Sequence, residues 1–209
     1  MSKYDILTET EARGIPRGAT VTLARGGHVT PLAQDTLRER RITVVREGAA
    51  GDETGLAPRS PVARLAVGSD HSGVALRKAI RDHLRGRGLA VQEIGPEGAD
   101  PADYPDTAAA VARLVAAGEV DAGIAIDGAG LGSAIAANKI AGVRAAMCTD
   151  KTLARYAREH NGANVLTLGA TLLTRDQALG IVETWIATPM TESRYIRRLG
   201  KIQGLERRG

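Results

Sequence analysis

The sequence predicts an α/β protein with a five-stranded parallel sheet and a small α/β extension before it. From residue 64 onward, short apolar runs alternate with stretches of helical periodicity, the pattern of a parallel sheet covered on both faces. The 209 residues are 43% hydrophobic and 25% charged, a composition that excludes a disordered or collagen-like chain. Residues 47–63 are rich in Gly, Ala, Pro and charged residues without apolar periodicity, so we expect a flexible linker there.

The extension, residues 1–46, carries signals for two helices and two short strands. Thr8 and Glu11 have the spacing of a capping box, and Thr30-Pro31 predicts a helix that runs to about Arg40. The expected strands are Ala19–Leu23 and Ile42–Val45. A unit of this size buries only a modest core, so we expect it to need a partner surface.

The main domain, residues 64–209, contains the sheet. Its expected strands are Leu65–Gly68, Ala90–Ile94, Gly123–Ile126, Val143–Met147 and Asn164–Leu168. Its expected helices are Val74–Arg85, Thr107–Ala117, Leu131–Lys139, Lys151–Glu159 and Asp176–Ala187, followed by a basic helix from about Glu192. Reactive side chains in such sheets gather beyond the carboxyl ends of the strands, so we expect the functional site at that edge.

Polar residues and glycines follow these elements. Asp70-His71 follows the first strand, Asp127 and a glycine run (Gly128, Gly130, Gly132) follow the third, and His160-Asn161 ends the helix before the fifth. We expect all three segments to face one crevice, although helix caps and a tight turn would explain each one alone. The glycine run suits a phosphate or a developing oxyanion. A nicotinamide enzyme is disfavoured, because Ser133 stands where the dinucleotide fingerprint needs its third glycine.

Charge, aromatic content and cysteine content narrow the classes of function. The last twenty residues, with six basic and two acidic side chains, account for the net charge of +4, which suits a small phosphorylated ligand at least as well as DNA. Aromatic residues make up 2% of the chain, which argues against a base-stacking surface for nucleic acid. The single cysteine, Cys148, excludes an internal disulfide or a thiolate metal cluster. With neither a leader peptide nor a membrane span in the sequence, the expected location is cytoplasmic.

Five segments of the main domain carry a family resemblance. They are GSDHSG at Gly68–Gly73, DYPD at Asp103–Asp106, DGAGLGSAIAANK at Asp127–Lys139, REHNGANV at Arg158–Val165 and SRYIRRL at Ser193–Leu199. With these segments in order, residues 64–203 resemble the ribose-5-phosphate isomerase B family, which includes galactose-6-phosphate isomerase subunits.

The resemblance implies a Rossmann-like three-layer domain in a homodimer, or a dimer of dimers, with active sites shared between subunits. It implies aldose–ketose isomerisation of a phosphorylated sugar without metal or cofactor, from ribose 5-phosphate to ribulose 5-phosphate or a close analogue in pentose phosphate metabolism. By the same resemblance, Asp70 and His160 help to open the sugar ring. The residues carried over as ligands are Tyr104 and Asn161 for sugar oxygens, the glycine run for the developing oxyanion, and His71, Arg194 and Arg198 for the phosphate.

The chain departs from the family at the residue that removes the proton. Many members have a cysteine where this chain has Asp127, and others use a glutamate at the position of Ser133. Asp127 is then the only general base in the run, and burial is expected to raise its pKa toward a useful value. Alternatively, Asp127 caps the following helix and catalysis is lost. Two further departures, Ala129 for a hydroxyl residue and Thr171 for a frequent arginine, leave the size of the sugar open.

The extension has a shorter resemblance of its own. Its segments LTETEAR and TPLAQDTLRERRITVV are similar to a region of enzymes associated with bacterial microcompartments, including ethanolamine-utilisation proteins. This resemblance implies recruitment to a microcompartment shell or core protein, with the enzyme inside the compartment; packing of the extension on its own catalytic domain is the alternative. Two readings stay open beside the isomerase: a catalytically silent binding or scaffold subunit, and, less favoured, a nucleotide-dependent oxidoreductase.

Overall fold

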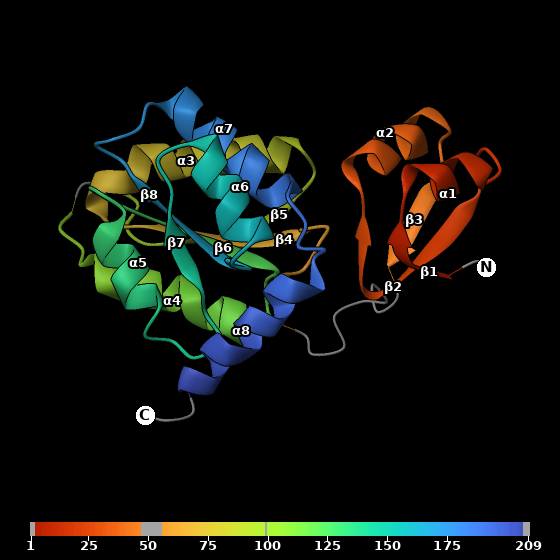
Figure 1. Ribbon diagram of the computed structural model, residues 1–209. Helices are drawn as coiled ribbons and strands as arrows, with labels where there is room; N and C mark the ends of the chain where they lie inside the picture. Colours follow the sequence, from red (N-terminus) through yellow and green to blue (C-terminus); the bar gives the residue numbers. More distant parts are fainter. Residues whose placement is uncertain (1–2, 47–55, 99, 207–209) are drawn as a thin grey trace. The chain divides into compact units, whose positions relative to one another are not determined.

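The computed structural model describes residues 3–46, 56–98 and 100–206 (Figure 1). The chain divides into two compact units, Met1–Thr54 and Gly55–Gly209. Most of the predicted linker, residues 47–55, lies outside the described residues. Its last part, residues 56–63, is described and belongs to the second unit.

The first unit is a small parallel sheet with two helices. Its elements are β1 (Lys3–Leu7), α1 (Glu9–Gly14), β2 (Thr20–Val29), α2 (Pro31–Glu39) and β3 (Thr43–Arg46), with β2 in the middle of the sheet. The predicted capping box forms: Thr8 Oγ1 accepts from the N–H of Glu11, and a Glu11 carboxylate oxygen accepts from the N–H of Thr8 at 2.7 Å. Strand β1 was not expected from the sequence.

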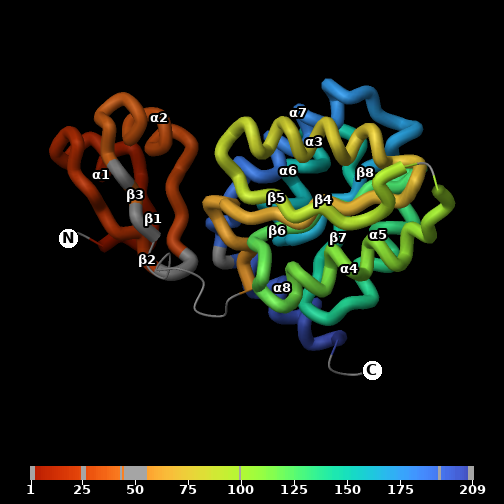
Figure 2. The backbone as a smooth tube through the Cα atoms, turned by 180° about the vertical axis from the view of Figure 1, so that it is seen from behind, coloured from red at the N-terminus to blue at the C-terminus, as the bar shows by residue number. Residues whose placement is uncertain are grey.

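The second unit contains the predicted five-stranded parallel sheet, in the order β5-β4-β6-β8-β7. The strands are β4 (Arg64–Ser69), β5 (Ala90–Ile94), β6 (Ala122–Asp127), β7 (Ala145–Met147) and β8 (Val165–Gly169). The helices are η1 (His71–Gly73), α3 (Val74–Gly86), α4 (Tyr104–Ala116), α5 (Leu131–Ala137), α6 (Lys151–Glu159), α7 (Arg175–Ala187) and α8 (Ser193–Glu206). Helices α3, α6 and α7 cover one face of the sheet, and α4 and α5 cover the other (Figures 1 and 2). This confirms a Rossmann-like three-layer α/β domain.

Apolar cores on both faces of the sheet hold the strands in place. All six residues of β6 are buried, as expected for a central parallel strand. On one face, Ile124 and Ile126 pack with Trp185 of α7, the only tryptophan of the chain, which is fully buried. On the other face, Val111 and Val115 of α4 pack against the sheet. The carboxyl ends of β4 and β6 are therefore fixed side by side.

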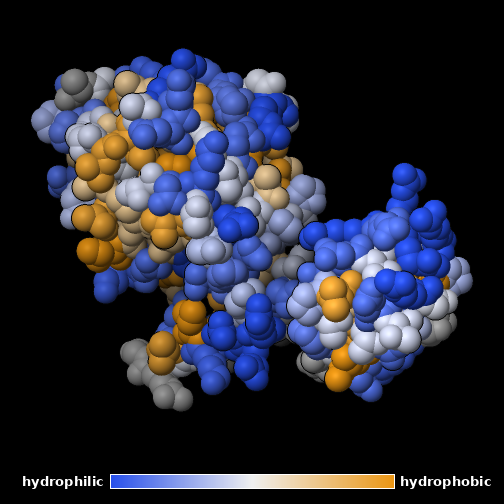
Figure 3. Space-filling model, turned by 45° about the horizontal axis from the view of Figure 1, so that its top comes forward, coloured by the Kyte–Doolittle hydropathy of each residue, from blue (hydrophilic) through white to orange (hydrophobic). Residues whose placement is uncertain are grey.

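Helix α5 keeps two large apolar residues exposed. Leu131 and Ile135 are 58% and 64% exposed, and their spacing of four places them on one face of the helix. Figure 3 shows apolar side chains gathered on this side of the second unit. Among the described residues, no helix combines the length and apolar character needed to cross a membrane.

Candidate active site

The glycine run forms a loop between the end of β6 and the start of α5. Gly130 has a φ of 78°, and a Cβ at this position would lie 2.8 Å from the carbonyl carbon of Leu168, so only glycine fits. The loop carbonyls bind the neighbouring segment: Thr167 Oγ1 donates to the Gly130 oxygen, and Thr171 Oγ1 donates to the Gly128 oxygen, both at 2.7 Å. These two hydrogen bonds therefore fix the loop to β8 and to the turn that follows β8.

Asp127 lies at the start of this loop, and its carboxylate is buried among backbone N–H groups. Oδ1 accepts from the N–H of Ala129 at 2.8 Å and from that of Gly130. Oδ2 accepts from the N–H of Ser133 at 2.7 Å. A carboxylate oxygen has about two acceptor positions, so the two N–H groups fill Oδ1, and Oδ2 is left to the N–H and the side chain of Ser133.

The pKa of Asp127 is lower than that of an ordinary aspartate, so the expectation of a raised pKa is wrong. Burial raises the pKa, but the hydrogen bonds from the Ser133 side chain and from the N–H groups of Ser133, Gly130 and Ala129 together lower it by more. Hydrogen bonds to the charged form always act in this direction. The geometry agrees with the alternative weighed from the sequence, in which Asp127 caps the loop and the first turn of α5.

Asp70 and His71 lie beside the glycine loop, as predicted. Asp70 Oδ1 accepts from Ser72 Oγ at 2.6 Å and from the N–H groups of Ser72 and Gly73, so this carboxylate caps η1. A Cβ on Gly128 would lie 3.9 Å from Ser72 Oγ, which places the two loops next to each other. His71 is exposed, and its Nδ1 lies 3.3 Å from the backbone of Ala102.

Tyr104 covers the other side of the glycine loop. Its ring lies so close to Gly132 that a Cβ there would come within 2.5 Å of Cζ and 3.0 Å of the hydroxyl oxygen. Tyr104 is the first residue of α4, which begins three residues earlier than the sequence analysis expected because Asp103 is the N-cap and Pro105 occupies the first turn. Asp70, His71, Tyr104, Asp127 and the glycine run thus form one site, which we call the β4–β6 site.

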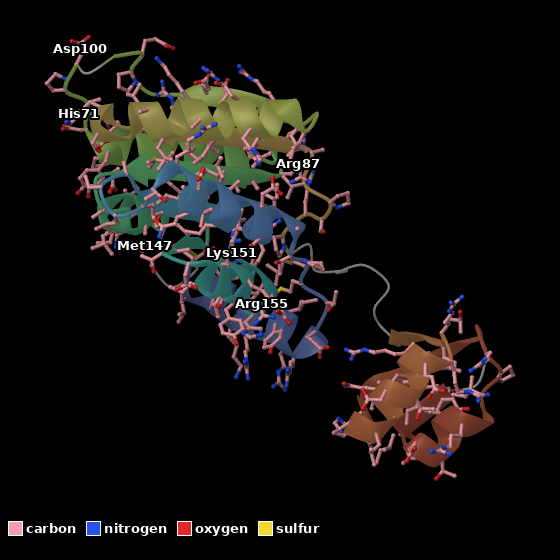
Figure 4. The ribbon with its side chains drawn as sticks, turned by 90° about the horizontal axis from the view of Figure 1, so that it is seen from above. His71, Arg87, Asp100, Met147, Lys151 and Arg155 are labelled. Carbon is pink, nitrogen blue, oxygen red and sulfur yellow. The ribbon has the colours of Figure 1, made fainter. Side chains whose placement is uncertain are left out.

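The remaining predicted residues lie elsewhere, so the three segments do not meet in one crevice of a single chain. Helix α6 runs antiparallel to the strands, and His160-Asn161 at its end leads into the amino end of β8. At the amino end of β8, the carbonyl oxygen of Asn164 accepts from the N–H of Gly123 in β6. At the carboxyl end of the same two strands, Asp127 of β6 pairs with Gly169 of β8. Four residues of strand separate these levels, about 13 Å. Figure 4 likewise separates His71 from Arg155 of α6.

His160 is the centre of a second group, which we call the α6–α8 cluster. Its ring stacks on Tyr156 and on Tyr195, with 4.6 Å between ring centroids in each case. Arg194 and Arg198 of α8 lie over the Tyr195 ring, and Asn161 donates to the carbonyl oxygen of Tyr156 at 3.1 Å. Sequence reasoning missed both tyrosines.

The amino-acid composition could have pointed to these two tyrosines. The chain has only four tyrosines, and three of them, Tyr104, Tyr156 and Tyr195, lie in the β4–β6 site or the α6–α8 cluster. No group of three or more His, Cys, Asp or Glu side chains able to hold a metal ion occurs in the described part of the chain.

The second unit is similar to known proteins over almost their whole length. A family model described as ribose/galactose isomerase matches residues 65–202. Ribose-5-phosphate isomerase B of Escherichia coli is 40% identical over 145 residues, which are 69% of this chain and 97% of that protein. Ribose-5-phosphate isomerase B of Clostridium thermocellum has a solved structure with a TM-score of 0.68 and 46% identity, over 69% of this chain and 98% of that one. The Mycoplasma genitalium enzyme, solved with bound ribulose-5-phosphate, has a TM-score of 0.67 and 35% identity, over 70% and 97%.

Proposed function

Because the chain belongs to the ribose/galactose isomerase family and is a sugar-phosphate aldose–ketose isomerase, we propose that it interconverts ribose 5-phosphate and ribulose 5-phosphate without a cofactor. The observation that carries this proposal is the β4–β6 site, where an acid, a histidine, a tyrosine and a glycine loop meet at the edge used for catalysis in such folds. Asp70 and His71 would contact the ring oxygen and the phosphate, and Tyr104 a sugar hydroxyl.

The isomerisation needs a base that moves a proton between C2 and C1 of the open-chain sugar. Asp127 Oδ2 is the candidate atom, because it accepts from one backbone N–H group whereas Oδ1 accepts from two. The lowered pKa makes this carboxylate a weak base, so we expect slower proton transfer than from a base with a pKa near 7.

The enediolate intermediate needs hydrogen-bond donors for its oxygens. Asp127 already occupies the N–H groups of Ala129, Gly130 and Ser133. The N–H groups of Gly128, Leu131 and Gly132 remain in the loop, and Gly132 lies against the Tyr104 ring. We assign the oxyanion to them and to the Tyr104 hydroxyl.

A second copy of the chain would complete the site. The α6–α8 cluster, with His160, Asn161, Arg194 and Arg198, lies at the opposite edge of the sheet from Asp127 and cannot reach a sugar held there. In a homodimer with shared sites, or in a dimer of such dimers, the partner's cluster would open the ring and bind the phosphate. The exposed apolar face of α5 offers a surface for this contact. Sedimentation would distinguish dimer from tetramer, and a monomer would contradict the proposal.

The test is an assay for ketose phosphate formed from ribose 5-phosphate without added cofactor, with unphosphorylated ribose as the control substrate. Turnover of ribose 5-phosphate alone is expected. Absence of turnover would favour a second function, a catalytically silent binding subunit. The specific observation in favour of that function is the capping of the loop by Asp127.

We also propose that the first unit recruits the enzyme to a bacterial microcompartment. The support is its separation into a compact unit and the similarity of its segments LTETEAR and TPLAQDTLRERRITVV to microcompartment-associated enzymes. A fluorescent protein fused to residues 1–54 should then concentrate in purified compartments, and the same protein fused to residues 55–209 should not. Equal distribution of the two fusions would contradict recruitment by this unit.

A further inference from the structure

One ring organises the α6–α8 cluster. Tyr195 is buried, and its ring contacts His160 on one side while the guanidinium carbons of Arg194 and Arg198 lie 4.8 Å and 5.5 Å from its centroid. Arg194 also donates to the Tyr195 hydroxyl at 3.0 Å. A shift of this ring would therefore move an imidazole and two guanidinium groups together.

A segment before the first strand of the domain supports that ring. Leu56 and Ala57 pack in the same apolar cluster as Tyr195, Leu199 and Met190. Leu56 also contacts the next turn of α8, since its Cδ1 would lie 3.9 Å from a Cβ on Gly200. We call residues 56–59 the strap.

Two arginines fix the backbone of the strap. Arg144 donates from Nη2 to the Leu56 carbonyl oxygen, and Arg158 donates from Nη2 to the Arg59 carbonyl oxygen, both at 2.8 Å. Arg59 in turn lies 3.3 Å from a carboxylate oxygen of Asp121. The strap is thus hydrogen-bonded at both ends to the rest of the second unit.

The buried Arg158 shows that the strap is an integral part of this unit. Its side chain is fully buried under the Trp185 ring, and burial, with a contribution from the nearby Arg144 charge, lowers its pKa to about 10. The Arg158 guanidinium donates to two carbonyl oxygens, those of Arg59 and Ala163. Without the strap, a buried charge would lose one of these two acceptors, which is strongly unfavourable.

The strap lies outside the part of the chain that matches the family model, residues 65–202. We infer that the strap positions Tyr195 and, through it, His160, Arg194 and Arg198 for binding the substrate. This inference rests on the proposed function, because it takes these three side chains as substrate ligands. Leu56 and Tyr195 are positioning residues, since neither needs to touch the sugar.

The test is Leu56→Ala in the full chain, with Leu205→Ala as the matched control on an exposed part of α8. Leu56→Ala is expected to raise KM for ribose 5-phosphate about fivefold or more, with a smaller change in kcat, because the arginines bind ground state and transition state alike. Leu205→Ala should leave both constants unchanged. Leu56→Met, which restores the volume, should restore KM.

A second readout does not depend on isomerase activity. The chain has four histidines, so His160→Gln identifies the imidazole signals of His160 in an NMR spectrum. Stacking between two tyrosines shifts these signals upfield, and Leu56→Ala should move them back toward the values of an exposed histidine. Unchanged His160 signals together with unchanged KM would overturn the inference. If wild-type protein lacked isomerase activity, the proposed function would fail while the NMR shift still decided the role of the strap. Should Leu56→Ala not fold, Leu56→Val is measured in the same way.

Discussion

Replacing Asp127 by asparagine separates its two possible roles. Loss of a base lowers turnover, whereas loss of a cap lowers the free energy of unfolding. The asparagine oxygen can replace Oδ1 and keep the N–H groups of Ala129 and Gly130, but its NH2 group then faces the N–H of Ser133. The Ser133 donor is left unsatisfied in a buried site, which costs about 1–3 kcal/mol. The two retained hydrogen bonds become neutral and each lose about 1 kcal/mol.

These losses predict a free energy of unfolding about 3–5 kcal/mol lower for Asp127→Asn than for the wild type. Urea denaturation followed by the fluorescence of Trp185 measures this value, because the only tryptophan is buried in the second unit. Asp150→Asn is the control: Asp150 caps α6 with one oxygen, Oδ1, which accepts from the N–H groups of Thr152 and Leu153. Asparagine caps helices as well as aspartate does, so we expect little change there.

The stability that Asp127 contributes should also depend on pH. The folded pKa of Asp127 lies below the ordinary value of 3.8, so its carboxylate stabilises the fold fully above about that pH and loses this effect as the pH falls further. The difference between wild type and Asp127→Asn should therefore shrink in acid. Equal stability of the two proteins at pH 7 would refute the capping argument. If Asp127 is also the base, turnover should fall at least ~100-fold, and near-normal turnover would remove it from the mechanism.

Three further predictions concern the phosphate, the glycine loop and the extension. Arg198→Ala should weaken binding of ribose 5-phosphate by about 1.5–3 kcal/mol in calorimetry, without affecting binding of ribose. Arg197→Ala, the control, should change neither affinity. Equal losses of affinity for the phosphorylated and unphosphorylated sugar would contradict this role. Gly132→Ala should lower kcat/KM at least ~10-fold, since its methyl group meets the Tyr104 ring. The same change added to Tyr104→Ala should lower kcat/KM little further, and additive losses would argue against a steric cause. Removal of residues 1–54 should leave kcat and KM within about twofold, because the second unit alone matches the relatives' length; loss of activity would make the first unit part of the catalytic fold.

The sheet of the second unit could be predicted because its strands are continuous apolar runs between helical stretches. All five strands follow from that pattern, although β4 and β6 each end one residue later than expected, and the grouping of Asp70 and Asp127 follows as well. Strand β1 was missed because KYDIL has only a short apolar run, and its pairing with β2 is a tertiary effect. The position of His160 could have been inferred, because a helix that connects two parallel strands ends at their amino edge.

The bonding of Asp127 could not be predicted from the sequence. Whether a carboxylate after a strand faces substrate or its own loop depends on the backbone conformation of that loop, here a left-handed Gly130 and the first turn of α5. Composition and spacing do not fix these dihedral angles. The same holds for the strap, because its hydrogen bonds join residues about 90 to 100 positions apart, from Arg144 to Leu56 and from Arg158 to Arg59.

The burial of Cys148 gives this protein a practical advantage in covalent labelling. Cys148 is the only cysteine, and burial together with the Asp150 charge raises the pKa of its thiol to about 12, so alkylating reagents should not modify the native wild-type protein. A thiol introduced by Asp127→Cys would lie among backbone N–H groups that favour the thiolate. Iodoacetamide should then modify one site, and protection by ribose 5-phosphate would report occupancy of the β4–β6 site without any measurement of turnover.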